Sequence, residues 1–204
     1  MVRRGEYLER MVVVPSGDLH LEGLYHRGKL RPPCVVAAPH PQQGGSMDSP
    51  VVAELAWAIT RAGHATLRFN YRGVGASEGA WSGGPGEVAD LESAIDQLLE
   101  TTGAPAIAVA GYSFGAWAAV QAALRRPEVA ALVLVSPPTA LLDFSGLARV
   151  QARVLAICAE DDDRSLLAGW LGPQGKLVTV AGADHFFTSG LPQVGRHAAR
   201  FVGG

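Results

Sequence analysis

Cysteine, net charge and long apolar stretches are all scarce in this sequence of 204 residues. Its two cysteines, Cys34 and Cys158, both lie inside short apolar runs of the kind that form buried strands. We therefore interpret them as small hydrophobic core residues and not as a disulfide pair. The sequence also lacks a Cys-x-x-Cys motif and paired histidines at ligand spacing, so no metal site is expected.

The formal net charge is only −2, and charged residues make up 18% of the chain. This balance offers no electrostatic basis for binding nucleic acid or an anionic membrane surface. No apolar run approaches the ~18 residues needed to span a bilayer. Residues 1–10 contain no apolar signal core, and the apolar run at residues 11–14 is too short to be one. We therefore expect a cytoplasmic protein.

Nucleotide-binding loops are missing as well, because neither Gly-x-Gly-x-x-Gly nor a Walker sequence is present. No cofactor is expected on this basis. Apolar residues account for 48% of the chain, which excludes a disordered protein. The length fits a single domain with a substantial core, and we expect one domain over residues 1–204.

Short apolar runs alternate with segments of helical pattern along most of the chain. Strands are expected at residues 7–14, 19–26, 34–38, 65–69, 106–110, 131–135, 154–158 and 177–180. Helices are expected at residues 50–62, 87–101, 114–124 and 192–202. This alternation predicts an α/β fold with a mostly parallel sheet covered by helices on both faces. Functional loops should then follow the carboxyl ends of the strands.

The most informative segment is Gly111-Tyr112-Ser113-Phe114-Gly115, which lies between an expected strand and an expected helix. A Gly-x-Ser-x-Gly turn in that position holds its serine in a strained conformation with the hydroxyl exposed. The flanking glycines allow the strand and the helix to approach closely. We therefore predict that Ser113 is a nucleophile, which requires a base and an orienting acid.

His185 is the candidate base, because it follows the expected strand at residues 177–180 in a glycine-containing loop. The alternative is a histidine of an ordinary surface loop. The other histidines that we considered have no such context and are expected to be solvated: His20, His26, His64 and His197.

The candidate acid lies in a run of four carboxylates at residues 160–163, directly after another expected strand. We favour Asp162, with Asp161 as the alternative. Their separations from His185 differ by one residue and do not discriminate between them. Glu160 and Asp163 are interpreted as solvated loop residues.

The chain resembles the α/β-hydrolase superfamily over nearly its whole length, and more narrowly the small, lidless serine hydrolases similar to dienelactone hydrolase. The resemblance rests on the 111–115 segment, on Pro39-His40-Pro41-Gln42-Gln43-Gly44-Gly45, and on the Arg-Gly-x-Gly-x-Ser sequence within residues 68–79. The resemblance implies the α/β-hydrolase fold without a sizeable lid. It also supports Asp162, because residues 159–162 align with the family's Gly-x-x-Asp motif, with alanine replacing glycine.

The same resemblance implies which backbone N–H groups stabilise an oxyanion. One would come from Phe114, and the other from Gln42 in the loop that matches the family's His-Gly sequence. Pro41 has no N–H group to donate, so the second donor must be Gln42 or Gln43. Gln43 is therefore the alternative to Gln42. His40 is interpreted as a structural residue of this loop, with a catalytic role as the alternative. Dienelactone hydrolase has a cysteine nucleophile where this chain has Ser113, so its substrate does not carry over.

Two further side chains leave alternatives open. Arg72 could bind a carboxylated substrate, although the simpler interpretation is that it tethers neighbouring loop carbonyls or carboxylates. Trp81 lies in a glycine-rich loop and could shape the entrance of a pocket.

Only residues 136–153 separate two of the expected strands, which leaves no room for a lid domain. We therefore expect an open pocket and a small or short-chain ester substrate, cleaved by a carboxylesterase with Ser113, His185 and Asp162. A peptidase, thioesterase, lactonase or perhydrolase could use the same residues, and a non-catalytic interaction module could use the same fold. The sequence does not decide the oligomeric state.

Overall fold

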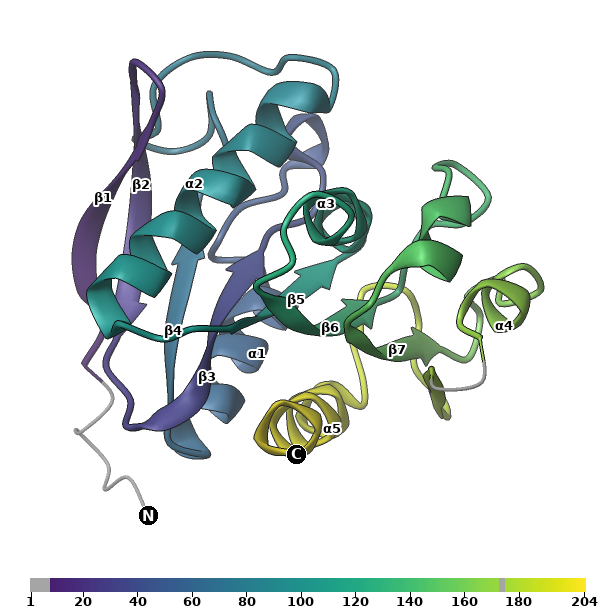
Figure 1. Ribbon diagram of the computed structural model, residues 1–204. Helices are drawn as coiled ribbons and strands as arrows, with labels where there is room; N and C mark the ends of the chain where they lie inside the picture. The colour runs from purple at the N-terminus through teal and green to yellow at the C-terminus, as the bar shows by residue number, and fades with distance from the viewer. Residues whose placement is uncertain (1–7, 173–174) are drawn as a thin grey trace.

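One sheet of eight strands runs through the centre of the structure, a computed structural model that describes residues 8–172 and 175–204 (Figure 1). The strands lie side by side in the order β1-β2-β4-β3-β5-β6-β7-β8. In chain order they are β1 (Arg10–Ser16), β2 (Leu19–His26), β3 (Leu30–Ala37), β4 (His64–Phe69), β5 (Ile107–Tyr112), β6 (Val129–Val135), β7 (Arg153–Ala159) and β8 (Lys176–Val180).

The sheet is mostly parallel, as the alternation of strands and helices predicts. The hairpin strands β1 and β2 pair antiparallel, and β2 also pairs antiparallel with β4. All remaining neighbours, from β4 through β3, β5, β6 and β7 to β8, are parallel. Their carboxyl ends therefore meet at one edge of the sheet, where side chains from distant parts of the sequence come together.

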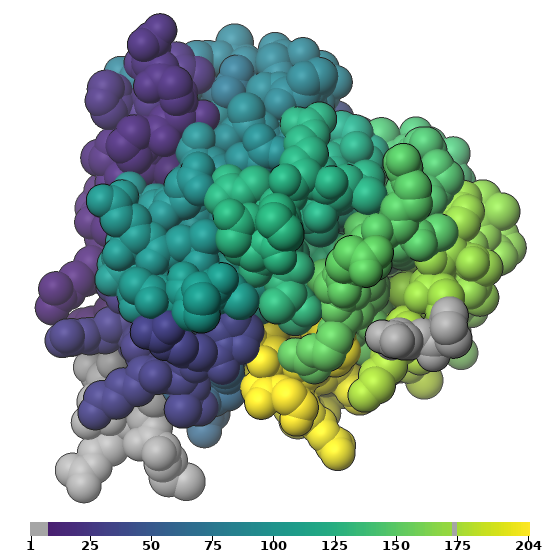
Figure 2. All heavy atoms as spheres, viewed as in Figure 1, coloured from purple at the N-terminus to yellow at the C-terminus, as the bar shows by residue number. Residues whose placement is uncertain are grey.

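Helices cover both faces of this sheet. Helices α2 (Pro85–Thr102) and α3 (Phe114–Ala123) contact each other and pack on one face, where their side chains close over the strands (Figure 2). Helices α1 (Pro50–Arg61) and α5 (Leu191–Gly203) contact each other on the opposite face. Because both faces are covered, the central strands must be apolar on both sides.

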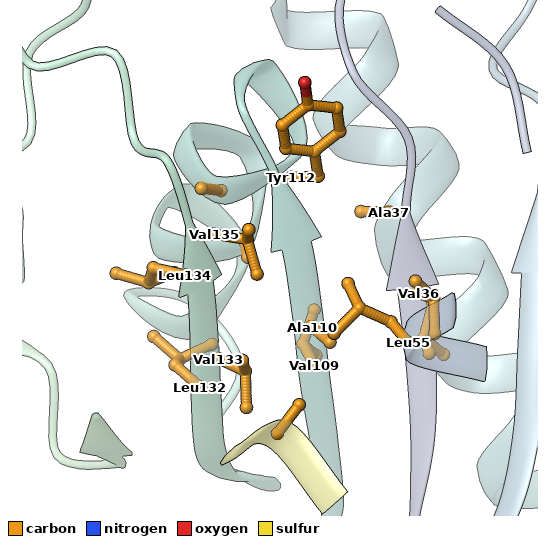
Figure 3. Close-up of a cluster of buried hydrophobic side chains, with 14 of the residues drawn as sticks. Val36, Ala37, Leu55, Val109, Ala110, Tyr112, Leu132, Val133, Leu134 and Val135 are labelled. Atoms are coloured by element: carbon orange, nitrogen blue, oxygen red, sulfur yellow. The ribbon is translucent and has the colours of Figure 1, made fainter. Parts of the chain in front are cut away.

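Figure 3 shows this core between strands β3, β5 and β6. Val36, Ala110 and Val133 are paired in register on these adjacent strands and are fully buried, and Leu55 of α1 belongs to the same buried cluster. Burial on both faces of the sheet explains continuous apolar runs such as residues 131–135. Tyr112 lies at the carboxyl end of β5, and its hydroxyl points away from the aliphatic side chains (Figure 3).

Most expected elements are present with ends shifted by a few residues, and β3 begins four residues earlier than expected, at Leu30. The predicted strand at residues 7–14 is found at Arg10–Ser16, and its expected first residue, Tyr7, lies outside the described residues. Three short helices were not anticipated: η1 (Pro41–Gln43), η2 (Ser145–Arg149) and α4 (Leu167–Trp170).

Residues 136–152 connect β6 to β7 directly, so no large lid is inserted there, as expected. Among the described residues, none of the helices combines the length and the apolar character needed to cross a bilayer.

Candidate active site

Ser113 occupies a strained turn between β5, which ends at Tyr112, and α3, which begins at Phe114. Its backbone angles are φ 53° and ψ −116°, a left-handed conformation that residues other than glycine rarely adopt. The Ser113 N–H donates to the carbonyl of Val135 at 2.9 Å, and Ala116 N–H donates to the Ser113 carbonyl at 2.9 Å. These bonds hold the turn at the carboxyl edge of the sheet.

The two glycines of the motif are required by close backbone contacts. A Cβ atom on Gly111 would lie 2.1 Å from the carbonyl oxygen of Gly115. A Cβ atom on Gly115 would lie 2.4 Å from the carbonyl oxygen of Ala37, at the end of β3. Helix α3 can therefore approach β3 and β5 only because neither position has a side chain.

His185 lies in the loop between β8 and α5, on the same edge of the sheet as Ser113. Its Nδ1 is 2.9 Å from Oδ1 of Asp162. The Tyr112 hydroxyl donates to the backbone carbonyl of His185 at 3.0 Å and so ties this loop to the end of β5. Burial raises the pKa of Tyr112 to about 12, so this hydroxyl keeps its proton.

The Asp162 carboxylate is held by three partners from different parts of the chain. Besides His185, the backbone N–H of Ala159 donates to its Oδ2 at 2.7 Å, and the Ser136 hydroxyl donates to the same oxygen. Burial raises the pKa of Asp162, but the hydrogen bonds from His185, Ser136 and Ala159, together with the charge of His185, outweigh burial and lower the pKa overall. Asp162 is therefore an ionised acceptor for the imidazole.

The other carboxylates of the run bond elsewhere. Glu160 accepts a hydrogen bond from the backbone N–H of Gly182 at 2.7 Å, and Asp163 accepts one from Ser165 N–H at 2.9 Å. Asp161 is exposed. Of the four carboxylates, Asp162 is therefore the one that the structure brings to His185.

The hydrogen bond with Asp162 raises the pKa of His185 above its usual 6.5. Burial of the ring opposes this shift, while the negative charges of Asp162, Asp161 and Asp184 add to it. The protonated imidazolium is thus stabilised in place. Since Nδ1 is paired with the carboxylate, Nε2 is the ring nitrogen left to exchange protons with a substrate.

Strained backbone is concentrated at this edge of the sheet. In the described part of the chain, the non-glycine residues with left-handed φ are Ser113, Ser136 and Phe187. Ser113 forms the turn after β5, Ser136 bonds to Asp162, and Phe187 follows His185 by two residues. Such strain persists only where the surrounding structure enforces it, and it is typical of functional sites.

Ser113 and His185 line an open cleft with two lobes that meet at these two residues. The Leu141 lobe, about 470 Å³, lies against residues 137–142 and against Asp162 and Asp163. The Phe186 lobe, about 600 Å³, lies against residues 49–51, residues 186–188 and Leu191. Each lobe alone has the volume of a small-molecule pocket.

The loop at residues 39–45 closes the cleft beside Ser113. His40 and Gln43 line both lobes, whereas Gln42 is not among the lining residues. The Gln42 N–H donates to His40 Nδ1 at 3.2 Å, and Gln43 N–H donates to the His40 carbonyl at 3.0 Å. His40 thus caps η1, which agrees with its interpretation as a structural residue of the loop.

Aromatic rings pack against the loop at residues 39–45. The His40 ring lies 4.5 Å from Trp81 and 5.2 Å from Phe114, measured between ring centroids. Trp81 therefore packs against His40 of the loop and against Phe114 at the start of α3. It is not among the residues that line either lobe.

Arg72 is committed to a buried carboxylate. Its Nε and Nη2 donate to the two oxygens of Asp90 at 2.9 and 2.7 Å, and Asp90 is fully buried. The interpretation of Arg72 as a tether is therefore the one that fits the structure. Among the described residues, no cluster of three or more potential ligand side chains could hold a metal ion.

The expectation that the remaining histidines are solvated is wrong for two of them. His64 is 1% exposed and its Nδ1 lies 2.8 Å from the carbonyl of Pro32, and His26 is also buried. Both lie at strand ends, where the imidazole packs against neighbouring elements. Sequence reasoning also missed Ser136, although a polar residue directly after the apolar run 131–135 is a signal for the same edge of the sheet.

Comparison with known proteins places these features in context. A family model described as alpha/beta hydrolase fold matches residues 40–160. An uncharacterised protein of Rickettsia prowazekii is 34% identical over 190 residues, which cover 85% of this chain and 79% of that protein.

Solved structures agree with this match. An alpha-beta serine hydrolase homologue from Coxiella burnetii superposes with a TM-score of 0.85 at 29% identity, covering 94% of this chain and 96% of the other. A Xanthomonas campestris protein described as a serine hydrolase without lid superposes with a TM-score of 0.81 at 28% identity, covering 95% and 94% of the two chains.

Proposed function

The chain belongs to the alpha/beta hydrolase fold family, and from that premise we propose that it is a serine hydrolase acting on small carboxylic esters. The observation that carries the proposal is the arrangement of three side chains at one edge of the sheet. Ser113 and His185 line the same two lobes, and His185 Nδ1 is 2.9 Å from Asp162. This is the set of residues that acyl transfer by a serine requires.

In the proposed reaction, Ser113 Oγ attacks the ester carbonyl carbon while His185 Nε2 takes the hydroxyl proton. The tetrahedral intermediate then collapses, and the leaving alcohol takes that proton from His185. Water attacks the resulting acyl-enzyme and gives a proton to Nε2, which returns it to Ser113 Oγ as the acid departs. Asp162 holds the imidazole tautomer and stabilises the imidazolium in both halves of the cycle.

The oxyanion is proposed to accept hydrogen bonds from Phe114 N–H and from the 39–45 loop. Phe114 is the first residue of α3, where backbone N–H groups have no partner within the helix and the helix dipole favours negative charge. Gln42 N–H is the proposed second donor, with Gln43 N–H as the alternative. Gln42 would have to turn this N–H from His40 Nδ1 toward the substrate. Each such donor is worth roughly 3–4 kcal/mol in the transition state.

The lack of a lid and the open cleft support a preference for small esters over long acyl chains. A cytoplasmic location is part of the proposal. Cys34 and Cys158 are both free and buried, and burial raises the pKa of each thiol to about 12. Unpaired, unreactive thiols of this kind are typical of reducing compartments.

The test is hydrolysis of p-nitrophenyl esters of increasing acyl length by the wild type, by Ser113→Ala and by Ser93→Ala. Ser93 is a matched control because its hydroxyl bonds to the Ala89 carbonyl within α2, away from the cleft. We expect hydrolysis to favour short acyl groups, to be abolished in Ser113→Ala and to be unchanged in Ser93→Ala. A Ser113→Ala protein that folds and retains the wild-type rate would contradict the proposal.

A further inference from the structure

The composition of the two lobes points to a narrower substrate class. Resting on the proposed esterase function, we propose that the substrate is an uncharged ester with an apolar group on each side of the scissile carbonyl, and that esters bearing a carboxylate are excluded. The carbonyl would sit at Ser113, where the lobes meet, so that the acyl group occupies one lobe and the alcohol group the other.

Both lobes present mainly carbon to a substrate. The Leu141 lobe has Pro137, Pro138, Leu141 and Leu142 on one wall. The Phe186 lobe has Pro50, Val51, Phe186 and Leu191. Leu141 is 81% exposed and Phe186 is 72% exposed, so each places a large apolar side chain at an open rim. An apolar group of the substrate would cover this surface and remove it from water.

No lysine or arginine lines either lobe in the part of the chain that the structure describes. Arg72, the residue that could have bound a substrate carboxylate, is paired with Asp90 instead. Arg164 lies near the acidic run, but its Nη1 donates to the backbone carbonyls of Ala159 and Glu160 and does not line the cleft. A substrate carboxylate would therefore lose its hydration without gaining a cationic partner.

Apart from the histidines, the charged side chains that line the cleft are negative. Asp162 and Asp163 line the Leu141 lobe, and hydrogen bonds lower the pKa of both against the opposing effect of burial, so both are ionised at neutral pH. Asp161 and Asp184 act on His185 through their charges. These groups would repel a substrate carboxylate. Anionic esters are therefore disfavoured both by this repulsion and by the lack of a cationic partner in the lobes.

Charge on the acyl side can be tested with three p-nitrophenyl esters: the pentanoate, the hydrogen glutarate and the methyl glutarate. The methyl glutarate matches the hydrogen glutarate in length but has no charge. We expect kcat/KM for the hydrogen glutarate to be lower than for its methyl ester by about 10-fold or more. Rates for Ser113→Ala are subtracted, which also removes intramolecular hydrolysis by the free carboxylate.

Charge on the alcohol side is tested with para-acetoxyphenylacetic acid and its methyl ester. The methylene group separates the carboxylate from the leaving phenol, so the two esters have similar intrinsic reactivity. We again expect the anionic ester to be the poorer substrate by about 10-fold or more. Equal kcat/KM for the charged and uncharged members of either pair would overturn the proposal.

Two variants that introduce a positive charge test whether the lobes cause the discrimination against anionic esters. Leu141→Arg and Phe186→Arg each place a cation at one exposed rim, and Leu30→Arg is the matched control at the amino end of β3, opposite the cleft. We expect one rim variant to raise the anionic-to-neutral kcat/KM ratio for glutarate by about 5-fold or more, and the control to leave it unchanged. If neither rim variant changes this ratio, the lobes do not receive the acyl group and the proposal fails.

Failure of the esterase function itself gives a different result. In that case the uncharged esters would be hydrolysed no faster by the wild type than by Ser113→Ala. Efficient Ser113-dependent hydrolysis of anionic esters, in contrast, would leave the esterase function standing and overturn only the substrate class.

Discussion

The Ser136 hydroxyl donates a hydrogen bond to Oδ2 of Asp162, while His185 binds the other oxygen of the same carboxylate. Ser136 follows β6 and is fully buried with φ 40°, so the backbone is strained at the point where this hydroxyl is directed at Asp162. The carboxylate is thus fixed from β6 as well as from its own loop. Ser136 therefore positions the residue that orients His185.

Removing this hydroxyl should slow turnover without weakening substrate binding. For Ser136→Ala we expect kcat to fall about 10-fold, which corresponds to ~1.4 kcal/mol for a hydrogen bond to a charged acceptor. KM should stay nearly constant because Ser136 does not line either lobe. Steady-state kinetics on a short-chain p-nitrophenyl ester measure both quantities.

Ser136→Gly provides the companion variant, because glycine adopts φ 40° without strain. Ser136→Gly should lose as much activity as Ser136→Ala, but it should unfold at a higher urea concentration than Ser136→Ala does. Wild-type kcat in both variants would show that the hydroxyl does not position Asp162.

The pH dependence of activity should reflect the raised pKa of His185. In the proposed mechanism hydrolysis requires the neutral imidazole, so kcat/KM should increase with pH as His185 loses its proton. Since the hydrogen bond with Asp162 and the nearby negative charges raise this pKa above 6.5, the midpoint of the rise should lie above pH 6.5. A pH–rate profile of kcat/KM with a neutral ester measures it.

Asp161→Asn removes one of the charges that stabilise the imidazolium and should move this midpoint to lower pH, whereas Asp18→Asn in the β1–β2 turn should not. The raised pKa of His185 also makes the stability of the fold depend on pH. The contribution of His185 to the free energy of unfolding is fully present below pH 6.5 and is lost as pH rises through the raised pKa. A midpoint at or below pH 6.5 in the wild type would contradict this account.

The sequence was sufficient to predict the α/β fold, the mostly parallel sheet and the positions of Ser113 and His185 after strands. These features depend on local patterns: apolar runs, the Gly-x-Ser-x-Gly spacing and the alternation of element types. The match to the alpha/beta hydrolase family at residues 40–160 confirms the resemblance to that family.

The sequence favoured Asp162 over Asp161 without deciding between them, because the distinction arises from a local turn and from a neighbouring strand. Asp162 faces His185 because its Oδ2 accepts a hydrogen bond from the Ala159 N–H and another from Ser136. Ser136 directly follows β6, which is adjacent to β7 only in the folded sheet. The assignment of Asp162 as the catalytic acid remains a prediction.

The glycines of the turn at Ser113 should be intolerant of a single methyl group. In Gly111→Ala the new Cβ would lie 2.1 Å from a backbone oxygen, which cannot rotate away as a side chain could. We expect a loss of about 2–4 kcal/mol in the free energy of unfolding as α3 is pushed from the sheet. Urea denaturation followed by far-UV circular dichroism gives this value.

Gly169→Ala is the matched control for this substitution. A Cβ at Gly169 would meet no atom within 4 Å, so stability should change by less than about 0.5 kcal/mol. Similar unfolding midpoints for the two variants would mean that the close approach of Gly111 and Gly115 is not needed for the fold.

Loss of the Asp90 carboxylate of α2 should be costly, because Asp90 is fully buried and accepts hydrogen bonds from Ser16, from the Arg72 backbone and from the Arg72 guanidinium. For Asp90→Asn we expect the free energy of unfolding to fall by about 3 kcal/mol, as is typical when one partner of a buried ion pair is removed. The value should lie at the low end of the usual range because the Arg72 side chain keeps 18% exposure to water.

Asp96→Asn tests whether burial is the cause. Asp96 lies on the same helix and also pairs with an arginine, Arg126, but its side chain is 65% exposed. Water and salt screen such a pair, so its removal should cost less than about 1 kcal/mol. A large difference between the two variants in urea denaturation would assign the cost to burial of Asp90. Equal losses would mean that the Asp90–Arg72 pair stabilises the fold no more than a surface ion pair does.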